Sequence, residues 1–279
     1  MSRNYKYYKI FVITALFVLS LQGCESKFEF EPDSDNVNTL VVEAMITNEN
    51  KRHYVCLSKV EKDYYKSKIP ADSAFVAVVS ADSTFYYRED SIEKGKYYSE
   101  HDFAGIKDNV YYLHIEYQKI TYSANGKMTA VTPPDTIKWA LNTETGLYYL
   151  THVADNFVKE NPAMYEINLD WHDVEGYEDL PYDQTHALMY YYSLTTTDIS
   201  QLFAPEKETV EFPLGTKIIE RKYSLNHEHE MYIRSLLAET TWSGGFFDEA
   251  HGNLQTNIDN GAIGFFGVCT VYNDTIWVE

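Results

Sequence analysis

The chain has 279 residues, of which 23 are Lys or Arg and 42 are Asp or Glu, so its formal net charge is −19. This acidity argues against nucleic acid and anionic lipid as electrostatic partners, because both require a basic protein surface. With 44% hydrophobic residues the chain can bury a core, which excludes global disorder. Its length permits one large or two modest domains.

The first 23 residues have the composition of a signal peptide. Arg3, Lys6 and Lys9 form a basic start, and an apolar run follows over residues 10–21. As a helix this run would reach only about 18 Å, too short for a bilayer core of about 30 Å. A short apolar run behind a basic start is typical of an export signal that is later removed.

The apolar run is followed by Gly23 and Cys24, and the stretch 21–24 resembles a bacterial lipobox. We therefore expect cleavage before Cys24, followed by acylation of its thiol and amine with palmitate-type chains. Each buried CH₂ contributes about 0.8 kcal/mol, so several chains anchor the protein to a membrane. The alternative is an ordinary signal peptide with a coincidental cysteine.

Removal of residues 1–23 takes away three basic side chains and no acidic one, which leaves 20 basic and 42 acidic side chains and a net charge of −22. The following stretch, 24–37, is acidic and polar, and we interpret it as a tether. An acidic stretch behind a lipidated cysteine also loosely resembles the surface-export signals of Bacteroidota lipoproteins.

From residue 38 onward, short alternating stretches separated by polar turns predict β-strands. The first set is expected at 40–46, 53–57, 74–79, 84–87, 110–117 and 119–122, with turn signals at Asp82-Ser83, Lys94-Gly95 and Asn125-Gly126. The tandem prolines Pro133-Pro134 favour an extended connector, so we place a domain boundary there. A second set is expected at 136–140, 146–154, 164–171, 187–196, 208–212, 217–224, 262–272 and 274–278.

One helix is predicted over about 227–239. Asn226 can cap it, Glu228 and Glu230 suit its positive end, and apolar side chains recur at helical spacing after them. Strands without intervening helices favour antiparallel pairing. The predicted fold class is therefore all-β and mainly antiparallel, with two β-sandwich domains at 38–132 and 133–279 and one short helix in the second.

Two cysteines remain in the exported part. Cys56 and Cys269 can form a disulfide in an oxidising compartment, but they are far apart in sequence. We favour two separate thiols that behave as small buried hydrophobes.

Two clusters raise the question of a metal. In a helix His227 and His229 lie on opposite faces, unlike the i, i+4 pair of zinc proteases, so a polar first turn explains them better. The carboxylates Asp170, Asp173, Glu175 and Asp179 crowd one loop and are the candidate calcium ligands. That loop lacks EF-hand spacing, and a solvated acidic loop is the simpler interpretation.

No catalytic signature is present. The chain has no G-x-S-x-G or H-E-x-x-H motif, and Gly261, Gly264 and Gly267 lack the lysine of a phosphate loop. Bulges or close backbone packing account better for these glycines. We therefore expect a protein that is not an enzyme.

Adjacent tyrosines recur along the predicted strands, where neighbours point to opposite faces. Each pair therefore directs one ring to the core and one to solvent, and outward rings suit either half-buried strands or binding surfaces. Trp242, Phe246 and Phe247 fall in a predicted loop after the helix. Aromatic residues on a loop are the better candidates for ligand contact.

Several features together resemble the Bacteroidota outer-membrane lipoproteins grouped as domain of unknown function 4249. They are the lipobox, 40–43, Gly95-Lys96-Tyr97-Tyr98, 110–115, Pro133-Pro134, 161–165, 233–237, Gly252-Asn253, Asn257-Ile258 and the glycine-rich stretch 261–267. The first domain also resembles transthyretin-like, Ig-like and carboxypeptidase-regulatory-like sandwiches.

This resemblance implies a location and an architecture but no activity. It implies a lipid-anchored protein of the outer membrane, which we expect on the extracellular face. Relatives often accompany TonB-dependent outer-membrane transporters and their partner lipoproteins, which implies an accessory or ligand-capture role. The alternative is a stand-alone glycan- or peptide-binding or adhesion module.

Overall fold

A computed structural model describes residues 39–61, 67–205, 208–244 and 254–279, and these residues belong to one compact unit. The predicted signal peptide (1–23), Cys24 and the tether (24–37) lie outside the described residues. The domain boundary at residues 132–133 stays a prediction. None of the helices in the described ranges has the length and hydrophobicity to span a bilayer.

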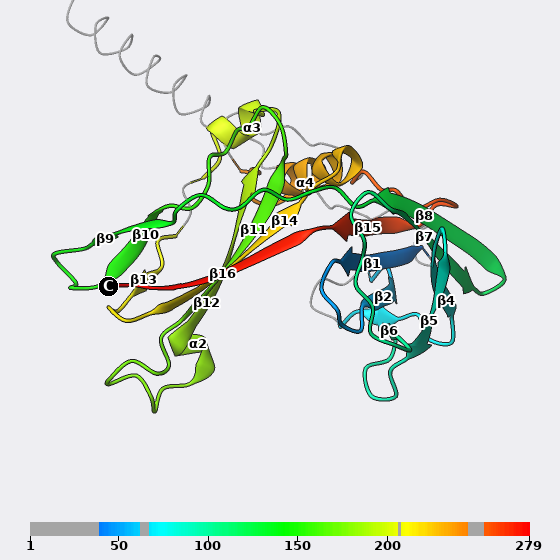
Figure 1. The fold of residues 1–279 in the computed structure, drawn as a ribbon, viewed down its shortest axis with the longest axis horizontal. Helices are drawn as coiled ribbons and strands as arrows, with labels where there is room; N and C mark the ends of the chain where they lie inside the picture. Colours follow the sequence, from blue (N-terminus) through cyan, green and yellow to red (C-terminus); the bar gives the residue numbers. More distant parts are fainter. Residues whose placement is uncertain (1–38, 62–66, 206–207, 245–253) are drawn as a thin grey trace, which may run out of the picture. The chain divides into compact units, whose positions relative to one another are not determined.

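The largest element is a nine-stranded sheet with the order β15-β1-β2-β6-β5-β4-β7-β8, in which β3 adds to β2 (Figure 1). Its strands are β1 (Leu40–Thr47), β2 (Tyr54–Lys59), β3 (Ile69–Pro70), β4 (Phe75–Ser80), β5 (Ser83–Glu89), β6 (Lys96–Ser99), β7 (Val110–Tyr117), β8 (Ile120–Lys127) and β15 (Ile263–Cys269). The end strands β8 and β15 approach each other, so the sheet is nearly closed around its own core.

Alternation of side chains explains this core. Tyr87 and Tyr111 are buried, whereas their neighbours Tyr86 and Tyr112 are each 53% exposed. Adjacent residues of a strand point to opposite faces, so each pair contributes one ring to the core and one to the surface. The prediction for the tyrosine pairs is confirmed at these positions.

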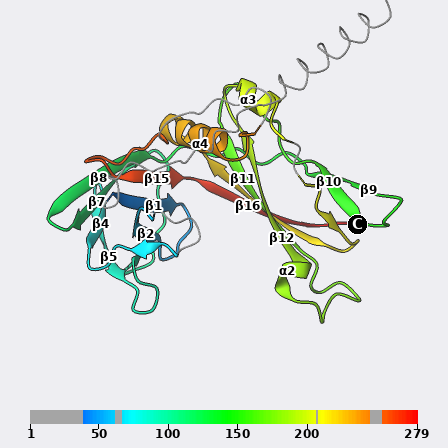
Figure 2. The same ribbon diagram turned by 180° about the vertical axis from the view of Figure 1, so that it is seen from behind.

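β15 pairs with β1 in parallel, from Val41 opposite Ile263 to Thr47 opposite Cys269, whereas the other strand pairs described in this sheet are antiparallel. Both Figure 1 and Figure 2 show the two strands side by side. A Cβ atom at Gly264 would lie 2.0 Å from the carbonyl oxygen of Val42, and the φ of Gly264 is +98°. Only glycine therefore permits this approach, which confirms the prediction of close backbone packing.

Segment 257–260 lies against the gap between β8 and β15. Asp259 accepts hydrogen bonds from the backbone N–H of Ser123 at 2.6 Å and from its hydroxyl at 2.5 Å. Asn260 donates to the backbone oxygen of Thr121 at 2.7 Å. β8 is an edge strand, with no strand among the described residues paired to this side. The side chains of Asp259 and Asn260 therefore provide hydrogen-bond partners for its main chain.

The remaining strands form two smaller sheets. A four-stranded sheet has the order β12-β11-β14-β16, and a three-stranded sheet has the order β13-β10-β9. A shared core between them contains Tyr165, Ile167, Phe212 and Ile218. Their bounds are β9 (Lys138–Leu141), β10 (Tyr148–His152), β11 (Ala163–Asp170), β12 (His186–Ser193), β13 (Glu211–Phe212), β14 (Lys217–Ser224) and β16 (Val271–Trp277).

Three helices are described: α2 (Tyr182–Thr185), α3 (Ile199–Leu202) and α4 (His227–Glu239). α4 has the predicted bounds, and the side chain of Asn226 accepts from the N–H of His229 at 2.9 Å as its cap. The buried side of α4 packs Ile233 and Leu237 against a third core that also holds Trp242.

The all-β, mainly antiparallel class is confirmed, and most predicted strands match the observed ones within a few residues. One turn was wrong: Asn125-Gly126 lies inside β8, where Gly126 leaves room for the side chain of Val268. The predicted strand 262–272 is two strands, with β15 in the nine-stranded sheet and β16 in the four-stranded sheet. β3, β6, α2 and α3 were not predicted.

Candidate functional site

Of the three aromatic residues predicted to contact a ligand, only Trp242 lies within the described residues. Phe246 and Phe247 lie outside the described residues, whereas Trp242 lies in the turn that follows α4. The backbone N–H of Trp242 donates to the carbonyl oxygen of Leu237 at 2.8 Å, which returns the chain onto the last turn of the helix. Trp242 is only 6% exposed, so it is part of a core as well as a candidate for ligand contact.

Trp242 forms one wall of a pocket with a volume of about 180 Å³. Its other walls come from β12, from α3 and the residues after it, and from α4. The lining residues are Asn156, Tyr191, Tyr192, Gln201, Ala204, Pro205, Leu237, Thr241 and Trp242. The lining combines three aromatic rings with two amides and contains no charged side chain. We call it the Trp242 pocket.

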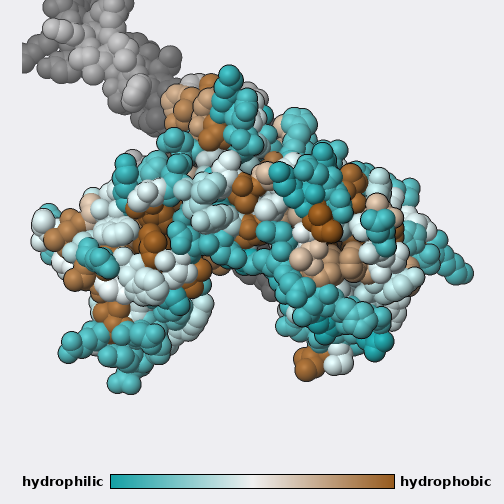
Figure 3. Space-filling view, viewed as in Figure 1, coloured by the Kyte–Doolittle hydropathy of each residue, from teal (hydrophilic) through white to brown (hydrophobic). Residues whose placement is uncertain are grey.

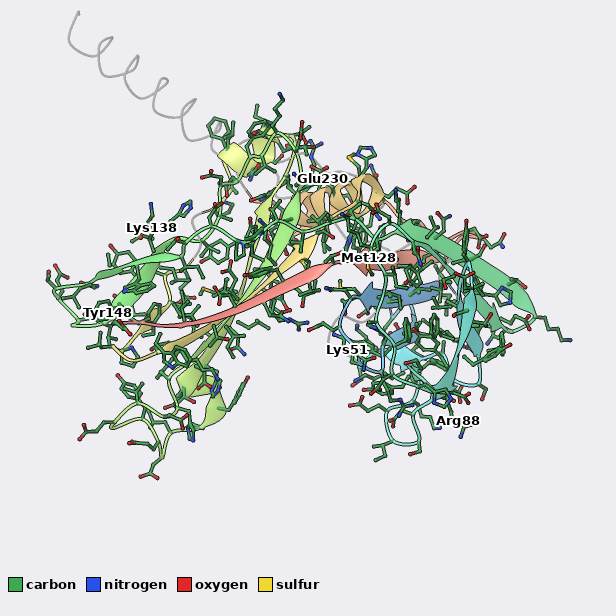
Figure 4. The ribbon with its side chains drawn as sticks, in the orientation of Figure 1. Lys51, Arg88, Met128, Lys138, Tyr148 and Glu230 are labelled. Atoms are coloured by element: carbon green, nitrogen blue, oxygen red, sulfur yellow. The ribbon has the colours of Figure 1, made fainter. Side chains whose placement is uncertain are left out.

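Two side chains of α4, four residues apart, hold the pocket walls together. The carboxylate of Glu230 accepts from the N–H of Thr195 at 2.5 Å and from its hydroxyl at 2.7 Å. Arg234 donates to the carboxylate of Asp198 at 2.9 Å, and Asp198 also caps the N-terminus of α3. Residues i and i+4 share a helix face, so α4 fixes the segment between β12 and α3 at two points (Figure 4 labels Glu230 on α4).

Two polar side chains of the pocket, Gln201 and Tyr192, are affected by burial. Gln201 has a buried amide oxygen with no hydrogen-bond partner among the described residues. Burial raises the pKa of Tyr192 to about 12, and the neighbouring Tyr190 adds to this effect. The phenol is therefore neutral at physiological pH. An unpaired buried oxygen is costly, so a bound group that donates a hydrogen bond to Gln201 would gain affinity there.

The candidate calcium ligands are not brought together. An oxygen of Asp170 lies 3.1 Å from Nε2 of His186, whereas Asp173, Glu175 and Asp179 are exposed. Within the described ranges, no three His, Cys, Asp or Glu side chains are grouped so that they could hold a metal ion. The fold gives the calcium hypothesis no geometric support.

One pair that sequence spacing did not indicate is His229 and Cys269. The thiol of Cys269, on β15, lies 3.5 Å from Nδ1 of His229, on α4. Burial lowers the pKa of His229 to about 4 and raises that of Cys269 to about 12, so both groups are uncharged. An activated cysteine requires the opposite shifts, which makes this a packing contact.

Cys56 and Cys269 are both unpaired, as favoured from the sequence. Cys269 is buried and Cys56 is half-buried. Both lie in the nine-stranded sheet, on β2 and β15.

A search among curated proteins found no relative of the chain. The sequence model of one family matches residues 25–275 of the 279. That match includes every residue of the Trp242 pocket and all strands of the three sheets except the last two residues of β16. The chain therefore belongs to the family described as Domain of unknown function (DUF4249).

Proposed function

We propose that the protein is a lipid-anchored lipoprotein on the extracellular face of the outer membrane. There it serves as an accessory or ligand-capture subunit of a TonB-dependent transporter assembly. The export signal and Cys24 support the anchor, and the resemblance of the sequence to transporter-associated lipoproteins supports the partner. The role is one of binding and not of catalysis.

The Trp242 pocket is the observation that carries this proposal. Its volume of about 180 Å³ is below the roughly 300 Å³ at which small-molecule sites begin, but it suits a single inserted side chain. Interface hot spots are often buried aromatic or Arg anchors that fill such pockets. The unpaired oxygen of Gln201 favours an anchor that carries a hydrogen-bond donor.

Purification in a mild detergent, followed by mass spectrometry, tests the proposal. We expect an outer-membrane barrel transporter to co-purify with the native chain. Ala204→Phe should reduce this recovery, because the added ring fills the pocket. Ala81→Phe, at an exposed turn between β4 and β5, is the matched control and should leave recovery unchanged. Purification of the native lipoprotein alone would count against the proposal.

The alternative is a stand-alone glycan- or peptide-binding module. The outward rings on the nine-stranded sheet favour it: Phe75 lies 6.2 Å from Tyr86 and 6.0 Å from His114, measured between ring centroids. Hydrophobic residues also form separate patches among hydrophilic ones on the face in Figure 3. This alternative predicts a change in tyrosine fluorescence with ligand that is lost in Tyr86→Ala. No response across a broad glycan and peptide panel would exclude it.

A further inference from the structure

A second hollow, with a volume of about 290 Å³, lies where the first turn of α4 meets β8, β15 and segment 254–260. We call it the α4 hollow. It is separate from the Trp242 pocket, which lies at the other end of α4, and it shares no lining residue with it. Its volume is at the lower limit of sites that take a small ligand. The hollow is preformed, because hydrogen bonds of Asn257 hold the segment to both strands.

Four polar side chains that line the hollow have no hydrogen-bond or ionic partner among the described residues. They are Asn125 on β8, His227 and Glu228 on α4, and Gln255 in the segment. Together they present two amides, an imidazole and a carboxylate, so both donors and acceptors face one small volume. A ligand with several hydroxyl groups can pair with all of them, since each hydroxyl both donates and accepts.

The remaining lining consists of Thr256 and Asn257, whose polar side chains pair with the main chain, and of two apolar side chains. The ring of Phe265 stacks on those of His229 and Tyr232 from α4, with ring centroids 4.7 Å apart in each pair, so its position is fixed. Met231 adds a flexible apolar surface beside it. A floor of this kind complements the C–H face of a sugar ring, as aromatic and apolar side chains do in many ligand sites.

The charge of the hollow excludes anions. Among the described residues no Lys or Arg lines it, the carboxylate of Glu228 has no basic partner, and the chain as a whole has a formal net charge of −19. A phosphate, sulfate or carboxylate group would be repelled. The hydroxyls of a neutral sugar instead donate to the carboxylate in charge-assisted hydrogen bonds, which are the stronger kind. We propose that the α4 hollow is a binding site for a neutral hexose unit of a glycan.

Saturation-transfer NMR on the full-length protein tests this directly, in a detergent without a sugar head group. The probes are D-glucose, D-galactose, D-mannose and N-acetylglucosamine, with D-galacturonic acid as the anionic counterpart. At least one neutral hexose should give saturable signals, and galacturonic acid should bind more weakly. Glu228→Gln and Asn125→Ala should each weaken binding by about tenfold or more, because each removes a polar partner of the ligand.

Glu239→Gln is the control, because it removes one carboxylate from the exposed opposite end of the same helix. Glu228 and Asn125 are exposed, so their variants should retain the circular dichroism of the native protein. Saturable binding that survives both substitutions would overturn the proposal. So would the absence of binding by all four neutral sugars, or binding of galacturonic acid at least as tight as theirs. None of these outcomes depends on whether a transporter co-purifies.

Discussion

The side chain of Asn257 pairs with the main chain of Phe266 in the manner of a strand. Its Oδ1 accepts from the N–H of Phe266 and its Nδ2 donates to the carbonyl oxygen, both at 3.0 Å. The same Nδ2 donates to the carbonyl oxygen of Asn125 on β8 at 3.2 Å. One amide therefore joins β15 to β8 at the point where the nine-stranded sheet nearly closes.

Asn257→Asp tests this closure. Aspartate retains the acceptor but loses both donated hydrogen bonds and adds a half-buried charge. We expect the free energy of unfolding to fall by about 1–3 kcal/mol, measured by urea denaturation. Asn50→Asp, at an exposed residue in the turn after β1, is the control and should change it by less than about 0.5 kcal/mol. Equal effects of the two substitutions would show that Asn257 does not join the strands.

Gly264→Ala tests the approach of β15 to β1. The new methyl group would overlap the carbonyl of Val42, so we expect the free energy of unfolding to fall by about 3 kcal/mol or more. Gly261→Ala is a matched control in the same segment, because its φ is +77° and no atom lies within 4 Å of the added Cβ. Gly261→Ala should lower the free energy of unfolding by only about 1 kcal/mol, which is the backbone strain of a side chain at positive φ. Similar melting temperatures for the two variants would contradict the contact.

These two predictions show what the sequence revealed and what it did not. The glycines of 261–267 and the motif at Asn257 were recognisable as a family signature, and close packing was the favoured explanation. The partner strand β1 lies about 220 residues away, and local alternation carries no information on such pairing. For the same reason β15 was assigned to the second set of strands.

The helix and the tyrosine pairs were predictable because their signals are local. Asn226 and the spacing of Ile233 and Leu237 define α4, and alternation separates Tyr111 from Tyr112. The Trp242 pocket was not predictable, because its walls come from β12, α3 and α4. Trp242 itself was selected as a loop aromatic, and its burial depends on tertiary packing that the sequence does not show.

The ion pair between Arg221 and Glu49 should be energetically coupled. Arg221, on β14, donates to Glu49 at 2.7 Å, and both side chains are only 26% exposed. A double-mutant cycle of Arg221→Ala and Glu49→Gln should give a coupling energy of about 1–3 kcal/mol. Arg88 and Glu100, 2.9 Å apart but with Arg88 at 78% exposure, provide the comparison and should give less than about 0.5 kcal/mol. Coupling no larger than in that exposed pair would refute the prediction.

The free energy of unfolding should fall as pH rises from 4.5 to 7 because of Glu220. Burial, reinforced by the nearby Asp274, raises the pKa of Glu220 from 4.5 to about 7. The folded protein therefore holds a proton between pH 4.5 and 7 that the unfolded chain has released, so the free energy of unfolding decreases as pH rises through this window. Glu220→Gln should remove that decrease, as followed by thermal melting from pH 5 to 8. An unchanged slope in the variant would contradict the role of Glu220, and Glu239→Gln controls for the loss of one carboxylate.

The central claim, a partner seated at the Trp242 pocket, is tested most directly by site-specific photo-crosslinking in intact cells. A photoreactive residue at Thr241 lies on the exposed rim of the pocket, and one at Ala81 lies on an exposed turn outside it. We predict a covalent adduct between position 241 and an outer-membrane barrel transporter, and none from position 81. No transporter adduct from position 241, or equal adducts from both positions, would contradict the proposal.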